Sequence, residues 1–162
     1  MINAPFGEVF VRKATVNDAQ GLSDMHAAAF RRGWSDAEIE ALISQDNVTG
    51  LIADWRRALG RRRHGAGFLI YRTAADEAEI LTIAVVPAFR RRGVGGRLLD
   101  EALRALYREG IARLYLEVEE GNRPAIRLYE NRGFGRASTR PGYYAQSRAT
   151  PQGALVMSRQ VR

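Results

Sequence analysis

The sequence contains no cysteine, only two histidines and a single lysine, Lys13, among its 162 residues. Without cysteine there is no disulfide framework, no thiolate zinc site and no cysteine nucleophile. The two histidines, His26 and His64, are too few for a histidine-rich metal site. No run approaches the roughly 18 consecutive apolar residues that a membrane-spanning helix needs, and residues 1–10 lack the pattern of a signal peptide. We therefore expect a soluble, cytoplasmic protein with no metal and no membrane partner.

The composition is that of an ordinary globular protein, with 46% hydrophobic and 27% charged residues. It excludes a disordered chain, a collagen and a coiled coil. The length fits one domain with a core of its own, so we expect a single domain over residues 1–162.

The net charge is +7, and apart from Lys13 every basic residue is an arginine. Arginine binds phosphate through paired hydrogen bonds, which favours an anionic partner such as a nucleic acid or a phosphorylated ligand. A basic protein without such a partner, in which arginine replaces lysine through coding bias, has the same composition. The charge alone does not choose between these interpretations.

Apolar periodicity and helix caps predict alternating strands and helices of a mixed α/β layer fold. Thr15 with Asp18, Ser35 with Glu38, and Asn122 are typical helix caps. The apolar stripe Leu98, Leu99, Ala102, Leu103 and Leu106 predicts a helix that ends before Gly110. We expect helices after each cap and along that stripe, an exposed arginine-rich loop at 56–65, and strands at 7–13, 51–55, 67–72, 78–86, 111–118, 134–139 and 154–158.

The most informative segment is a buried strand that leads, through Pro87 and a basic, glycine-rich turn, into a helix. Glycines let a ligand approach the backbone, and a helix N-terminus offers N–H groups to an anion. A Walker A loop is excluded because no Lys-Ser or Lys-Thr follows, and a Rossmann fingerprint is disfavoured because Leu98 stands at its third glycine position. What remains is an R-x-x-G-x-G pattern at 90–95, which by itself is also common as a purely structural turn.

This turn, following the strand 81–86, resembles the acetyl-CoA motif of the GCN5-related N-acetyltransferase (GNAT) family. The resemblance implies a single GNAT domain, with a mixed, mostly antiparallel sheet whose middle strands splay apart between flanking helices. It also implies that the turn amides bind the CoA pyrophosphate, and that the preceding strand pairs with pantetheine and polarises the thioester carbonyl. The acetyl-CoA-binding residues implied are Ile83, Ala84, Val85, Arg90, Arg91, Arg92, Gly93, Val94, Gly95 and Gly96, with Asn122 as a further contact.

A second motif, at 116–134, resembles the L-E-V-x-x-x-N-x-x-A-x-x-L-Y-x-x-x-G-F signature of the ribosomal-protein-alanine N-acetyltransferases within that family. The resemblance implies that Glu117 is the general base, which accepts the amine proton through a water, and that Tyr129 protonates the leaving CoA thiolate. Glu119 is the alternative base, because strand alternation puts it on the same face as Glu117. Without the motif, Glu117 reads as a solvated strand-end side chain and Tyr129 as a core residue.

Three aromatic residues complete the resemblance. Tyr143 and Tyr144 match an R-x-x-Y-Y segment that would hold the substrate peptide, and Trp34 follows a turn in which Gly33 replaces the usual proline. On residue type alone, the paired tyrosines are at least as well explained by packing.

The resemblance implies acetyl transfer from acetyl-CoA to a protein N-terminus, by direct attack of the amine and without a metal. The acceptor implied is the N-terminal alanine of a small-subunit ribosomal protein. An α-amine has a pKa near 8, so roughly a tenth of it is neutral at pH 7 and modest base assistance is enough. Two alternatives stay open: acetylation of a lysine or a small-molecule amine, and a non-catalytic module that binds acyl-CoA or, less favoured, nucleic acid.

Overall fold

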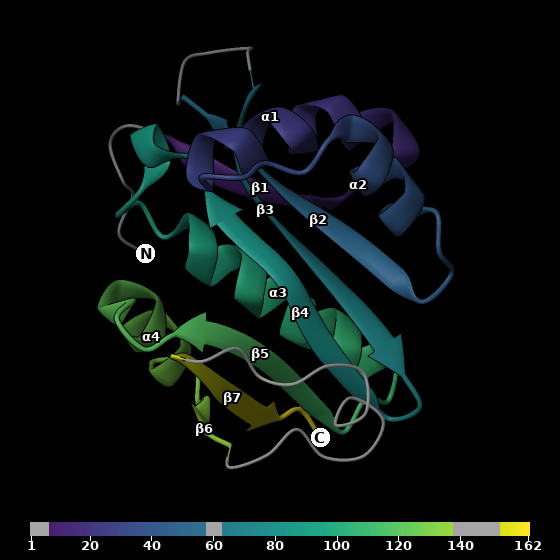
Figure 1. Ribbon diagram of the computed structural model, residues 1–162, viewed down its shortest axis with the longest axis vertical. Helices are drawn as coiled ribbons and strands as arrows, with labels where there is room; N and C mark the ends of the chain where they lie inside the picture. Colours follow the sequence, from purple (N-terminus) through teal and green to yellow (C-terminus); the bar gives the residue numbers. More distant parts are fainter. Residues whose placement is uncertain (1–6, 58–62, 138–152) are drawn as a thin grey trace. The chain divides into compact units, whose positions relative to one another are not determined.

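The computed structural model describes residues 7–57, 63–137 and 153–162 of the chain (Figure 1). The described chain divides into two compact units. Unit 1 consists of Met1–Ile70 and Thr82–Ala102 in their described parts, and unit 2 of Tyr71–Leu81 and Leu103–Arg162 in theirs. Two strands, β3 (Arg63–Ala74) and β4 (Glu77–Val85), and the helix α3 (Val94–Arg108) contribute residues to both units.

Unit 1 combines antiparallel strands with the N-terminal helices. Its strand order is β1 (Glu8–Lys13), β2 (Val48–Arg56), β3 and β4, and β1 pairs antiparallel with β2 from Glu8–Arg56 to Lys13–Leu51. The fully buried side chains of Leu22, Ile39 and Phe68 form part of its core. Its remaining elements are η1 (Val16–Asp18), α1 (Ala19–Ala29), α2 (Asp36–Ile43), η2 (Pro87–Phe89) and the first half of α3.

The predicted caps of the first two helices are confirmed. The Asp18 carboxylate accepts the Thr15 N–H at 2.8 Å, although the first turn that follows is a 3-10 helix rather than α. Ser35 and Glu38 form the full reciprocal box, with Ser35 N–H donating to Glu38 at 2.8 Å and Glu38 N–H donating to Ser35 Oγ at 3.2 Å. These bonds satisfy N–H groups that the helix itself leaves without a partner.

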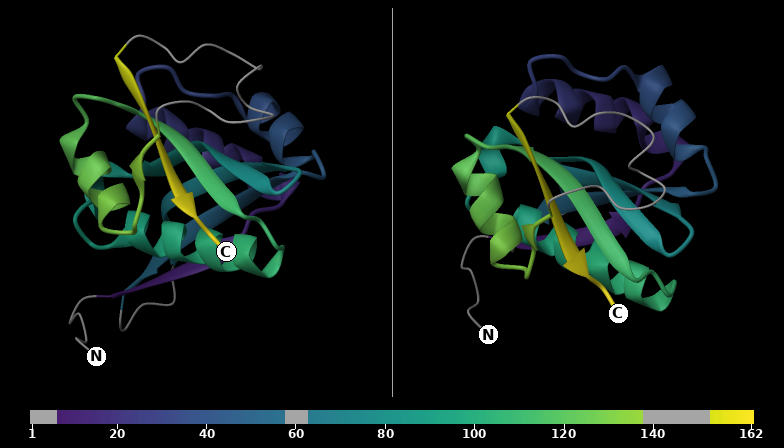
Figure 2. Two further views of the ribbon diagram at one scale, coloured as in Figure 1. Left: turned by 90° about the horizontal axis from the view of Figure 1, so that it is seen from below. Right: turned by 60° about the horizontal axis from the view of Figure 1, so that its bottom comes forward.

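Unit 2 is built on β5 (Arg113–Glu119), which lies between β4 and β7 (Ala154–Gln160). Figure 2 shows β7 running alongside β5, and the register joins them antiparallel from Arg113–Gln160 to Glu119–Ala154. β6 (Gly135–Arg136) pairs antiparallel with the other edge of β7. The helix α4 (Arg123–Glu130) follows β5.

The parallel pair of β4 and β5 joins Glu77 to Arg113, Ala78 to Leu114 and Glu79 to Tyr115. These are the first three residues of each strand, as the prediction of splayed middle strands requires. The predicted fold class, a mixed and mostly antiparallel sheet with flanking helices, is confirmed. No helix in the described residues is long and apolar enough to cross a membrane.

Three expectations about the elements are corrected. β3 begins at Arg63, so residues 63–65 belong to a strand and not to the arginine-rich loop; their exposed side chains carry no apolar pattern that would reveal them. Leu103 is half-exposed rather than buried with the rest of the α3 stripe. β6 is a two-residue strand in place of the start of the expected strand at 134–139, of which residues 138 and 139 lie outside the described part.

Candidate active site

In unit 1, the strand β4 ends in a turn whose backbone is set by hydrogen bonds and by two positive φ angles. The Val86 N–H donates to the Ala66 carbonyl at 2.8 Å, and Pro87 then begins η2. Arg91 has φ 62° and Gly93 has φ 77°. A Cβ placed on Gly93 would meet nothing within 4 Å, so the backbone at this glycine faces open space. A ligand can therefore reach the backbone of the turn.

The helix α3 starts directly after this glycine. The Gly93 carbonyl accepts the Arg97 N–H at 3.0 Å, which closes the first turn of the helix. The first N–H groups of a helix have no carbonyl partner within the helix, and the helix dipole makes this end attractive to anions. The start of the 15-residue α3 is therefore a candidate site for a phosphate group; Val94, Gly95 and Gly96 are buried there, and their role toward the phosphate stays a prediction.

The three arginines of the turn are exposed, but they are not equivalent. The Arg92 guanidinium lies 5.1 Å above the Trp55 ring and 5.9 Å from the Phe89 ring. Such cation–π contacts hold a guanidinium in place. Arg92 therefore has a fixed position beside the turn, a constraint that the sequence gives no reason to expect.

A glycine that the sequence analysis did not single out lies against the end of β4. A Cβ on Gly67 of β3 would come within 2.6 Å of the Ala84 carbonyl oxygen and 3.1 Å of Val94 Cγ1. Real Cβ atoms essentially never approach so closely, so only glycine lets β3 lie against the strand that leads into the turn. The available signal was a glycine at the start of the predicted strand 67–72.

The predicted pantetheine-binding residues occupy the last part of β4. Ala84 is buried, whereas Ile83 and Val85 are half-exposed. Strand alternation accounts for the difference, because successive side chains point to opposite faces. The assignment of Ile83–Val85 to pantetheine stays a prediction.

In unit 2, the two candidate bases on β5 have different surroundings. Glu117 is half-buried, its Oε1 atom is fully buried, and its register partner is Val156 of β7. Glu119 stands on the same strand face but is exposed, at the last position of β5. A partly buried carboxylate is better placed to exclude bulk water from a proton transfer, which favours Glu117.

A short capped turn connects this strand to α4. The Asn122 N–H donates to the Glu119 carbonyl at 2.9 Å, and Asn122 Oδ1 accepts the Ala125 N–H at 3.3 Å. Pro124 lies in the first turn, and Gly133, with φ 81°, follows the end of the helix. The predicted cap, proline and terminal glycine are confirmed, and the role of Asn122 toward CoA stays a prediction.

Tyr129 lies on the buried side of α4, with 5% of its surface exposed and its ring 5.8 Å from that of Phe134. Burial raises the pKa of Tyr129 from 10.0 to about 12, because the phenolate loses hydration there. The phenol therefore remains protonated throughout the physiological pH range and can act as a proton donor.

The raised pKa of Tyr129 makes stability fall at alkaline pH. Below pH 10 the phenol is protonated in the folded and the unfolded state, so its contribution to stability is present in full. This contribution is lost as the pH rises through 12, because the phenol ionises at a lower pH in the unfolded state. When the pH rises from 9 to 11, the free energy of unfolding of the parent should fall by about 1 kcal/mol more than that of Tyr129→Phe. Urea denaturation at the two pH values measures this difference, and equal losses would contradict the burial argument.

The face of unit 2 that carries Glu117 holds further charged groups. By register and alternation, Glu77 and Glu79 of β4 share this face with Arg113 and Tyr115 of β5. Glu79 is 5% exposed, and its Oε2 lies 3.8 Å from Arg72 Nη2. Burial raises the pKa of the Glu77 carboxyl and of the Tyr115 phenol. This polar face was not predicted, although Glu77, Glu79 and Leu81 alternate in the sequence with the residues of the opposite face.

The predicted substrate-binding aromatics are only partly described. Trp34 is half-buried; its ring stacks on His26 with centroids 4.6 Å apart, and its backbone N–H donates to His26 Nδ1 at 3.1 Å. The Ser23 hydroxyl donates to the Trp34 carbonyl at 2.7 Å, which ties the turn to α1. The role of Trp34 toward a peptide stays a prediction, and Tyr143 and Tyr144 lie outside the described residues.

Comparison with known proteins places this site in context. The model of the acetyltransferase (GNAT) family matches residues 19–134. The chain is 40% identical over 93 residues to the [ribosomal protein bS18]-alanine N-acetyltransferase of Salmonella typhimurium, which covers 57% of this chain and 62% of that protein. The chain thus spans less than two thirds of that relative's length.

Two solved structures have the same fold. The ribosomal-protein-S18-alanine N-acetyltransferase of Escherichia coli matches with a TM-score of 0.75 and 27% identity, over 95% of this chain and 94% of that one. The PaiA N-acetyltransferase of Thermoplasma acidophilum, solved in complex with coenzyme A, matches with a TM-score of 0.70 over 94% and 99% of the two chains. At 19% identity, the second match concerns the fold alone.

Proposed function

Because the chain belongs to the acetyltransferase (GNAT) family, we propose that it transfers the acetyl group of acetyl-CoA to the N-terminal α-amine of a protein. We further propose that the acceptor is a small-subunit ribosomal protein that begins with alanine. The observation that carries the proposal is the 40% identity to a relative that is named for acetylation of the alanine of ribosomal protein bS18. We assign residues of unit 1 to binding of acetyl-CoA and residues of unit 2 to the two proton transfers.

Acetyl-CoA is the group-donating substrate, and the turn of unit 1 suits its phosphates. The open backbone at Gly93 and the start of α3 would hold the pyrophosphate through N–H groups, and the exposed Arg90 and Arg91 would add charge-assisted hydrogen bonds. Arg92, held by Trp55, would present a fixed positive charge. The end of β4, Ile83–Val85, would pair with pantetheine and donate an N–H to the thioester oxygen.

Glu117 and Tyr129 of unit 2 would move the two protons of the reaction. The neutral amine nitrogen attacks the thioester carbon to form the N–C bond, and Glu117 takes the proton that the amine loses, through a water. The tetrahedral intermediate then collapses, the C–S bond breaks, and the sulfur leaves as a thiolate. The Tyr129 phenol, which is protonated at neutral pH, would supply the proton that converts this thiolate to free CoA, and the phenolate would regain a proton from solvent.

An α-amine acceptor agrees with the modest base available. At pH 7 a lysine side chain is more than a hundred times less often neutral than an α-amine, so it needs a stronger base or a larger pKa shift. Trp34, Tyr143 and Tyr144 are assigned to holding the backbone of the acceptor peptide.

Free CoA release from acetyl-CoA tests the proposal with a panel of amines. The panel consists of short peptides with free Ala, Ser, Met and Gly N-termini, one peptide with a blocked N-terminus and an internal lysine, and spermidine. We expect turnover on the free Ala peptide and none on the blocked one. Turnover only on lysine or spermidine would replace the acceptor and keep the acetyltransferase; binding of acetyl-CoA without turnover on any amine would favour a non-catalytic module.

A further inference from the structure

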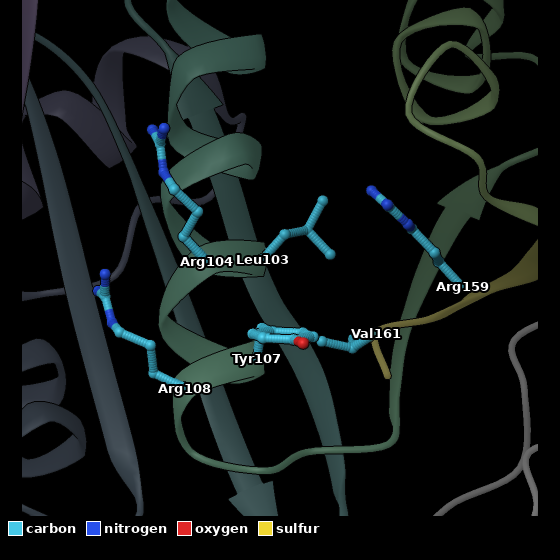
Figure 3. A pocket seen from close by; sticks show the side chains of 6 residues that line it. All are labelled: Leu103, Arg104, Tyr107, Arg108, Arg159 and Val161. Atoms are coloured by element: carbon cyan, nitrogen blue, oxygen red, sulfur yellow. The ribbon is translucent and has the colours of Figure 1, made fainter.

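Unit 2 contains an open hollow of about 330 Å³ that is separate from Glu117 and Tyr129 and has no place in the proposed reaction. It lies between the C-terminal half of α3 and the end of β7. Figure 3 shows Leu103 and Tyr107 extending from α3 toward the side from which Arg159 and Val161 come. The residues that line it are Leu103, Arg104, Tyr107, Arg108, Arg159 and Val161.

The hollow exposes apolar surface that the described part of the chain leaves uncovered. Tyr107 has 54% of its surface exposed, the highest value for a large hydrophobic side chain in the described part of the chain. Leu103 and Val161 beside it are half-exposed. Leu103 belongs by its spacing to the buried stripe of α3, yet here it faces the hollow. A tyrosine flanked by aliphatic side chains is a typical anchor position of a protein interface.

Arginines border this apolar surface. Arg104 and Arg108 stand one turn apart on α3, with their guanidinium groups on the side of the helix away from Arg159, and Arg159 comes from β7 (Figure 3). Arg162 adds a fourth guanidinium, 5.4 Å from the centre of the Tyr107 ring. The Arg159 side chain passes the turn at Gly133, where a Cβ on the glycine would lie 3.6 Å from Arg159 Nε and 3.9 Å from its Cζ.

The helix dipole explains only part of this cluster. A cation in the last turn of α3, such as Arg108, is favourable there. Arg159 and Arg162 come from another element, and Arg104 lies a full turn earlier. Arg104 and Arg108 also take part in other polar contacts, so the argument depends on the summed charge around an exposed aromatic ring and not on an unpaired arginine.

We propose that the hollow docks an acidic segment of a partner protein that carries one large apolar side chain. The apolar side chain would fill the space above Leu103, Tyr107 and Val161, and neighbouring carboxylates would bind the surrounding guanidinium groups. The aliphatic side chains of Leu103 and Val161 beside Tyr107 suit a peptide anchor better than a nucleic acid base, which stacks on aromatic rings. A second copy of this chain is disfavoured because the net charge of +7 and four arginines would face their like.

A double-mutant comparison tests the docking surface on the full chain. The probe is a fluorescent 12-residue peptide of Glu and Asp with one central Phe, acetylated at its N-terminus so that it cannot serve as an acceptor amine. We expect the peptide to bind saturably at low salt, with a Kd below about 100 μM. Tyr107→Ala should lower the affinity for this peptide about tenfold. A peptide with Ser in place of Phe should bind the parent and Tyr107→Ala equally weakly.

The arginines are tested by charge. Arg159→Gln should lower the affinity for the acidic peptide about tenfold. Arg31→Ala removes the same charge from an exposed position in unit 1, and its affinity for the peptide should stay within twofold of the parent. CoA release on the free Ala peptide should be the same in Tyr107→Ala and the parent, which separates this surface from the proposed reaction. Three results would overturn the proposal: equal loss with Arg31→Ala, tighter binding of a 12-nucleotide oligo(U) than of the peptide, or a dimer that Tyr107→Ala abolishes.

Discussion

Replacement of Glu117 by glutamine should lower kcat on a free Ala peptide about 100-fold while the KM for acetyl-CoA changes by less than twofold. Glutamine keeps the size of the side chain and its place on β5 opposite Val156, but it cannot accept the amine proton. Loss of a positioned general base costs about 10² to 10⁴ in rate, and an amine with a pKa near 8 places the loss at the lower end. Steady-state kinetics at pH 7 with both substrates varied measures the two parameters separately.

Glu119→Gln is the matched control for the base. It removes the same charge from the same strand face, two residues along, at an exposed position. We expect kcat to stay within about threefold of the parent. If Glu119→Gln abolished turnover and Glu117→Gln did not, the base would be Glu119, and the partial burial of Glu117 would have a structural role instead.

Local chemistry made much of the fold predictable. Caps and helix-terminal glycines act on backbone only a few residues away, so neighbouring residues in the sequence are enough to predict them. The examples are the pairs Ser35–Glu38 and Asn122–Ala125 and the glycine after α4. The turn at Gly93 is of the same kind, because a positive φ next to a helix start requires glycine or a near substitute.

Features that depend on contacts between distant residues were not predictable. Gly67 is required by the Ala84 carbonyl, 17 positions away, and Arg92 is held by Trp55, 37 positions away. The hollow at Tyr107 exists because the end of β7 leaves part of α3 uncovered, which the periodicity of α3 cannot show. Exposed strand residues such as Arg63 are likewise invisible to a pattern built on apolar side chains.

In the candidate site too, local features were predictable and features that depend on distant contacts were not. The positions of Glu117 on a strand, Asn122 at a cap and Tyr129 on a short helix followed from motif and periodicity. The raised pKa of Tyr129 and the charged face with Glu77 and Glu79 did not, because burial and strand pairing decide them. Roles toward acetyl-CoA and the acceptor come from the resemblance and are for experiment to test.

Substitution of Gly93 by valine should weaken acetyl-CoA binding about 100-fold with little loss of folding. Valine strongly disfavours φ 77°, so the turn must change its backbone angles, and the N–H groups that follow would move away from the proposed pyrophosphate site. Two lost hydrogen bonds to a charged group account for about 3 kcal/mol, which is of the order of 100-fold. A Cβ at Gly93 would meet no atom within 4 Å, so the variant should lose only the stability that the strained backbone angle costs and should still fold.

Two variants separate backbone geometry from bulk and from general strain. Gly93→Asn adds a side chain that tolerates a left-handed backbone, so its affinity for acetyl-CoA should fall less than tenfold. Gly153→Val places the same residue at another open glycine, with φ 81°, in unit 2, and should lower stability comparably without changing acetyl-CoA affinity. Isothermal titration with acetyl-CoA and urea denaturation of all three variants give both quantities. Unchanged binding by Gly93→Val would mean that the turn does not hold the pyrophosphate, and equal losses in Gly93→Val and Gly153→Val would mean that strain, not contact, weakens binding.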